Sequence, residues 1–102
     1  MRAVFVFTAL LAACPALAQD PDPELGRELA EQYCTNCHDI EADGQMKQYP
    51  PSFAAIAVFR SSEQIMSRIQ FPPFHVSMPQ MSLVLDASNV EDLTAYIVGL
   101  ER

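Results

Sequence analysis

The stretch that decides the fold of this chain is Cys34-Thr35-Asn36-Cys37-His38. Two cysteines three positions apart, followed directly by histidine, match the pattern of covalent haem attachment. Each thiol can add across one vinyl group of the haem, and the two intervening residues let one short turn reach both vinyls. The imidazole that follows can then bind the iron. We therefore predict one covalently bound haem c, attached through Cys34 and Cys37, with His38 as an iron ligand.

Two other kinds of site also contain closely spaced cysteines. A structural zinc site needs four ligands, and the sequence has no second pair of cysteine or histidine residues to complete one. A redox-active Cys-x-x-Cys pair belongs to a βαβ unit, and no such unit follows here. The haem interpretation is therefore favoured over both.

The first 18 residues have the features of an export signal. Arg2 provides a positive start, an apolar run follows, and Ala16-Leu17-Ala18 offers small residues at a cleavage site before Gln19. We expect residues 1–18 to be removed and residues 19–102 to form a single monohaem domain in the periplasm.

A second processing site competes with this one. Leu11-Ala12-Ala13-Cys14 resembles the lipobox of bacterial lipoproteins, which would make Cys14 a lipid anchor. Pro15 follows directly and the apolar run before Cys14 is short, so cleavage after Ala18 is favoured. The same run falls short of the ~20 apolar residues that a spanning helix needs. With Cys14 removed and the other two cysteines bound to haem, no disulfide is expected.

The charge of the chain is strongly acidic. The whole sequence carries −7, with thirteen acidic and six basic residues. Removing residues 1–18 takes away one arginine, so five basic residues remain against thirteen acids, a balance of −8. This argues against nucleic-acid binding, which needs basic patches. It agrees with a soluble protein that meets a basic docking face, although acidity can also serve solubility alone.

The apolar pattern predicts helices and no strands. Asp22 can cap a helix that has Pro23 at its first position, and Ser61 or Ser62 can cap another. The last helix can begin after Asp86 or, with a capping box, after Ser88. The expected helices cover residues of about 23–33, 53–59 and 62–69, and a stretch that ends near 100.

The second axial ligand is most simply Met78. It lies in an irregular stretch forty residues after His38, far enough along the chain to reach the opposite face of a haem. Pro79 stiffens the chain directly after it. His75, Met81 and an open coordination position remain as alternatives, and Met81 is expected to pack in the core.

Methionine ligation has a functional consequence. A thioether is a soft, neutral ligand that favours ferrous iron and raises the reduction potential. An iron with both axial positions filled has no vacancy for substrate, so we expect electron transfer and no enzymatic activity. A catalytic or gas-binding protein would need an open or displaceable position.

The stretch from Glu24 to Leu100 resembles a class I c-type cytochrome of the small exported bacterial kind. The resemblance rests on the haem motif together with Gly26 eight residues before it, Met78-Pro79, and Leu93-Thr94-Ala95-Tyr96-Ile97 near the end. It implies an all-α cytochrome c fold of three to five helices around the haem, in which the N- and C-terminal helices cross at the glycine. The sequence departs from the family at Ala30, where an aromatic residue is often found.

The resemblance also implies a function and further haem contacts. The function would be that of an electron carrier between a redox donor and an acceptor, as a monomer, or of the dedicated haem subunit of one periplasmic dehydrogenase. A proline carbonyl, from Pro51 or Pro50, would hold the N–H of the proximal imidazole. Arg60 is the favoured partner of the haem propionates. The other candidates for that role are Gln45, Lys47 and Tyr49.

Overall fold

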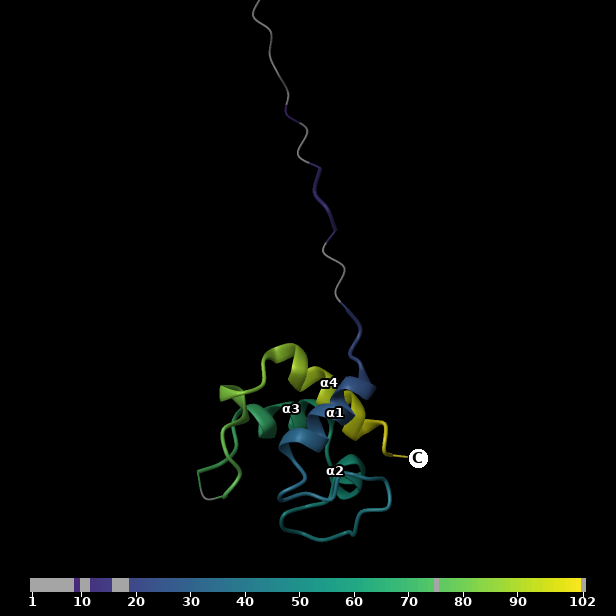
Figure 1. The fold of residues 1–102 in the computed structure, drawn as a ribbon, viewed down its shortest axis with the longest axis vertical. Coiled ribbons are helices and arrows are strands. Elements are labelled where there is room, and N and C mark those ends of the chain that lie inside the picture. The colour runs from purple at the N-terminus through teal and green to yellow at the C-terminus, as the bar shows by residue number, and fades with distance from the viewer. Residues whose placement is uncertain (1–8, 10–11, 16–18, 75, 102) are drawn as a thin grey trace, which may run out of the picture.

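The computed structural model describes residues 9, 12–15, 19–74 and 76–101. Within these residues the chain forms four α-helices and one 3-10 helix, and no strand beyond a single isolated bridge between Gln48 and Pro51 (Figure 1). The elements are α1 (Pro23–Tyr33), α2 (Phe53–Phe59), α3 (Ser62–Gln70), η1 (Met81–Leu83) and α4 (Ala87–Val98). The predicted all-α class is confirmed.

Most of the predicted export signal lies outside the described residues. Cys14 is described and is exposed. Among the helices that the structure describes, none is long and apolar enough to cross a membrane.

The helices begin where short polar side chains can accept their free N–H groups. The Asp22 carboxylate accepts hydrogen bonds from the first turn of α1, and Ser52 does the same for α2. Ser61 caps α3 in a capping box with Gln64, so of the two candidate serines it is the one that lies outside the helix.

The start of the last helix is decided by Asp86. Its carboxylate accepts a hydrogen bond of 2.8 Å from the N–H of Asn89, and the Asn89 side chain accepts from the N–H of Asp86. The alternative start at Ser88 is wrong, because Ser88 already lies inside α4. The negative charge of this carboxylate also interacts favourably with the positive N-terminal end of the helix dipole.

Helices α1 and α4 cross and form the most extensive helix contact of the described structure (Figure 1). Gly26 makes the close approach possible. A Cβ at this position would overlap the carbonyl oxygen of Asp92 and lie 3.0 Å from the Cα of Leu93. The side chain of Asp92 adds a second link, since its Oδ1 accepts a 2.7 Å hydrogen bond from the N–H of Asp22.

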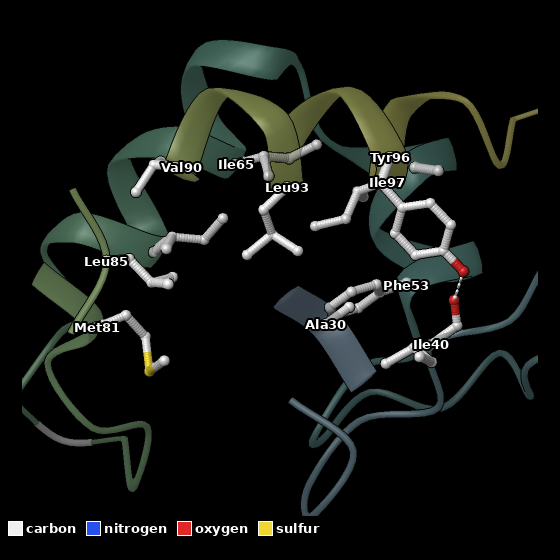
Figure 2. Close-up of a cluster of buried hydrophobic side chains, with 12 residues drawn as sticks. Ala30, Ile40, Phe53, Ile65, Met81, Leu85, Val90, Leu93, Tyr96 and Ile97 are labelled. Carbon is white, nitrogen blue, oxygen red and sulfur yellow. Dashed lines mark hydrogen bonds between the residues drawn. The ribbon is translucent and has the colours of Figure 1, made fainter. Parts of the chain in front are cut away.

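The core lies along the inner side of this crossing (Figure 2). Leu93 lies near its middle, between Met81 and Leu85 at one end and Phe53 and Ile40 at the other. Its members, all buried, are Ala30, Ile40, Phe53, Ala57, Ile65, Ile69, Met81, Leu85, Val90, Leu93, Tyr96 and Ile97. The Tyr96 hydroxyl donates a 2.8 Å hydrogen bond to the Ile40 carbonyl, which ties α4 to the loop after the haem motif.

The buried stripe of α1 consists of small residues. Gly26 and Ala30 are buried, and Ala30 is fully enclosed, whereas Leu25 and Tyr33 on the neighbouring stripe are more than one-third exposed. Alanine at the position where the family often has an aromatic residue therefore continues the close contact that the glycine begins. Leu29 packs beside it at the edge of the core.

Gly26→Ala is expected to destabilise the protein. Alanine in an open helix would stabilise by up to ~1 kcal/mol, but overpacking against rigid backbone costs about 1–3 kcal/mol or more, and the second effect dominates here. Thermal unfolding of the holoprotein, followed by circular dichroism, measures it. Gly99→Ala is the matched control, because its new Cβ would lie no closer than 3.3 Å to another atom. Equal melting temperatures for the two variants would contradict the tight crossing.

Candidate haem site

The Cys-x-x-Cys-His motif forms a tight turn directly after α1. Cys34 ends the helix, its N–H donating to the carbonyl of Ala30 at 2.9 Å. The N–H groups of Cys37 and His38 both donate to the Cys34 carbonyl, at 3.2 and 2.9 Å. The turn therefore brings the backbone of Cys34, Cys37 and His38 close together. Cys34 is half-buried and Cys37 exposed, and both are free thiols.

The imidazole of His38 is oriented by the chain that follows it. Its Nδ1 lies 2.6 Å from the carbonyl oxygen of Pro51. Because a carbonyl can only accept, Nδ1 is the donor, and in the neutral imidazole this leaves Nε2 with a lone pair for a metal. Of the two prolines that the resemblance offered, Pro51 makes this contact. The N–H of Phe53 donates to the Asp39 carbonyl at 2.9 Å and fixes the proline segment beside the histidine.

The pKa of the Cys34 thiol argues against a redox-active pair. Burial, and secondarily the neighbouring Cys37, raise the pKa of the Cys34 thiol to about 11. A redox-active cysteine needs a lowered pKa so that the thiolate can attack. No group of three or more His, Cys, Asp or Glu side chains that could hold a metal ion occurs within the described residues.

The two candidate methionines have different surroundings. Met78, in the loop between α3 and η1, is half-buried and packs against the same core as Cys34. Met81 is itself a core residue, with 6 % of its surface exposed, and it lies beside Leu85 (Figure 2). A methionine that is partly open can reach a cofactor, whereas one enclosed by apolar neighbours serves packing. His75 lies outside the described residues.

A contact that the sequence did not predict joins the two loops of the site. The Tyr49 hydroxyl lies 2.8 Å from Ser77 Oγ and accepts a 3.0 Å hydrogen bond from the Ser77 N–H. These hydrogen bonds lower the pKa of Tyr49 below its ordinary value. Ser77 directly precedes Met78, so the segment that follows the haem motif reaches the loop of the candidate sixth ligand. The two residues are 28 positions apart, and no sequence signal pairs them.

The candidate propionate partners lie in two places: Gln45 and Lys47 line a hollow together with His38, whereas Arg60 lines another. Arg60 is exposed at the end of α2, where it lines a small hollow of about 270 Å³ with residues of α3. The residues of the Cys-x-x-Cys-His turn do not line this hollow, so Arg60 as a propionate partner stays a prediction without structural support. Lys47 pairs with Asp39 at 3.4 Å, and Gln45 is exposed.

The residues present fit a haem. Two neighbouring thiols, an imidazole with a free Nε2 and a half-buried thioether are the donors that covalent haem c requires. The loops that Tyr49 and Ser77 join, the end of α3 and the helix η1 also expose large apolar side chains. They are Met46, Tyr49, Phe71, Phe74 and Leu83, and each is more than half exposed.

Comparison with known proteins agrees with this geometry. Residues 23–101, from the first residue of α1 to beyond the end of α4, match the family described as cytochrome c. No match was found among curated proteins or among solved structures. The match covers most of the chain and includes the haem-attachment turn. The chain therefore belongs to the cytochrome c family, whose members carry covalently bound haem c and transfer electrons.

Proposed function

We propose that this protein is an exported, periplasmic electron carrier with one haem c, attached through Cys34 and Cys37 and ligated by His38 and Met78. The observation that carries the proposal is the pair of contacts at the site. The Pro51 carbonyl holds Nδ1 of His38 and leaves Nε2 free, and Met78 packs half-buried against the same core as Cys34.

Individual residues of the chain have different roles in such a carrier. When bound, haem supplies an iron that takes up and releases one electron. Pro51 fixes the orientation of the His38 ring and raises its basicity as a ligand. Met78 favours the ferrous state and occupies the position that a substrate would need. Phe53, whose ring centroid lies 5.5 Å from that of His38, limits the movement of the imidazole.

The acidic surface supports transient docking. With a net charge of −7 over the whole sequence, the protein would be attracted to donors and acceptors that present basic faces. Such attraction speeds association and weakens as salt is added. A dedicated subunit of one dehydrogenase would instead remain bound. Co-purification from native extract at high salt distinguishes the two, since retention of a dehydrogenase would contradict the free carrier.

The optical spectrum and carbon monoxide test the ligand assignment. The oxidised holoprotein should show the weak far-red absorption band that is expected of Met-ligated haem c. The reduced holoprotein should bind carbon monoxide slowly or not at all at neutral pH, because Met78 occupies the site. Rapid, stoichiometric binding, or absence of the band at every pH where the protein stays folded, would favour a ligand-binding or catalytic haem protein.

A further inference from the structure

We propose that Tyr49 is a positioning residue for Met78: its hydroxyl holds Ser77 and thereby keeps the neighbouring thioether at the iron. This inference rests on the proposed ligation by His38 and Met78. It assigns Tyr49 to the methionine loop, in place of the propionate role for which the sequence made it a candidate.

The contact restrains both the backbone and the side chain of Ser77. The Tyr49 hydroxyl accepts from the Ser77 N–H at 3.0 Å and lies 2.8 Å from Ser77 Oγ. Because the phenolic oxygen meets two groups of one residue, it limits rotation of the backbone as well as of χ1. Met78 is the next residue, so its starting position is set by this contact.

Few other hydrogen bonds hold this loop. Among residues 72–74 and 76–80, the backbone N–H groups that donate a hydrogen bond to a described partner are those of Val76 and Ser77. The bond from Val76 to the Pro73 carbonyl, at 3.1 Å, is local to the loop. The bond from Ser77 to Tyr49 connects the loop to another part of the chain. Proline at positions 72, 73 and 79 cannot donate at all.

Tyr49, to which the methionine loop is bonded, belongs to a stiff segment of the chain. Tyr49 is followed by Pro50 and Pro51, whose rings fix the backbone angle φ. The carbonyl of Pro51 contacts His38 Nδ1 at 2.6 Å. One three-residue segment therefore touches His38 directly at one end and, through Ser77, orients Met78 at the other. This arrangement couples the two proposed ligands mechanically through protein atoms.

Displacement of Met78 by imidazole in the oxidised holoprotein tests the inference. Loss of the far-red band reports the displacement, and a net hydrogen bond corresponds to roughly two- to tenfold in an equilibrium. Tyr49→Phe removes both contacts and should lower the half-saturating imidazole concentration about tenfold. Ser77→Ala keeps the N–H contact and should lower it about threefold. Tyr33→Phe, which removes another exposed hydroxyl, one that accepts from Gln32 at 3.1 Å, is the control and should change nothing.

The double variant makes the test specific. If the two side chains act through one contact, the double variant Tyr49→Phe with Ser77→Ala should have the same half-saturating imidazole concentration as Tyr49→Phe alone. Fully additive effects would overturn the inference. A changed reduction potential in Tyr49→Phe with unchanged imidazole binding would overturn it too, because Tyr49 would then act on the haem directly.

The wild-type spectrum tests the ligation by Met78, and imidazole binding by Tyr49→Phe tests the role of Tyr49. A wild-type protein without the far-red band overturns the Met78 ligation and this inference together. A wild-type protein with the band, whose Tyr49→Phe variant binds imidazole as the wild type does, overturns the positioning role alone. Melting temperatures of the variants, expected to be unchanged, show that the fold is retained at these exposed positions.

Discussion

Serine in place of Cys34 or Cys37 is expected to leave little stable holoprotein. A hydroxyl cannot form the thioether, so at most one covalent link to the haem would remain. One thioether and the axial ligands would then have to hold the haem, so a decrease of roughly tenfold or more in holoprotein is expected. Haem content after denaturing electrophoresis and the intact mass of the purified protein measure the result.

Cys14→Ser is the matched control for these variants. If cleavage follows Ala18, the mature control protein is identical to the wild type, with the same mass and the same haem content. A wild-type mass that includes lipid, lost in the control, would show anchoring through Cys14 instead. Normal haem content in both Cys34→Ser and Cys37→Ser would contradict covalent attachment at this motif.

Replacing Met78 by alanine is expected to lower the reduction potential and to open the iron to added ligands. Axial ligands set haem potentials over a range of ~0.8 V, and loss of the thioether should lower this one by roughly 0.1–0.3 V. Carbon monoxide binding to the reduced protein should change from slow or absent to rapid and stoichiometric. Potentiometry and the optical spectrum follow both effects.

Two other methionines provide the comparison. Met46→Ala removes a side chain that is 59 % exposed and should leave potential and spectrum unchanged. Met81→Ala removes a buried core side chain and should cost about 2–5 kcal/mol of stability with the far-red band retained. A spectrum that changes with Met81→Ala and not with Met78→Ala would reverse the ligand assignment.

The sequence alone predicted those features whose signals lie within a few residues. The haem motif, Asp22 before Pro23, and Ser61 or Ser62 before the third helix each act over one turn of chain, so their physical consequences can be read locally. Gly26 could be interpreted because a glycine inside a helix is unfavourable unless close packing requires it. Together with the apolar pattern, these signals were sufficient for the all-α class and for the bounds of the first two helices.

Other features depended on which of two similar residues makes the contact in the folded chain. Asp86 and Ser88 are both good caps, and the contact of Asp86 with Asn89 decided between them. Pro50 and Pro51 are both prolines near His38, and geometry brings the Pro51 carbonyl to the imidazole. Pro79 favoured Met78 over Met81 in the sequence, and the structure adds that Met81 is buried in the core whereas Met78 is half-buried in a loop.

What the sequence by itself determined is the chemistry of this protein: two thiols, an imidazole and candidate thioethers on a helical chain. The tertiary structure decided how these groups are held. Tyr49 meets Ser77 across 28 residues, and Asp92 meets the N–H of Asp22 across 70. Hydrogen bonds of this kind leave no periodic or neighbouring pattern in a sequence, because their partners become adjacent only when the helices cross and the loops close.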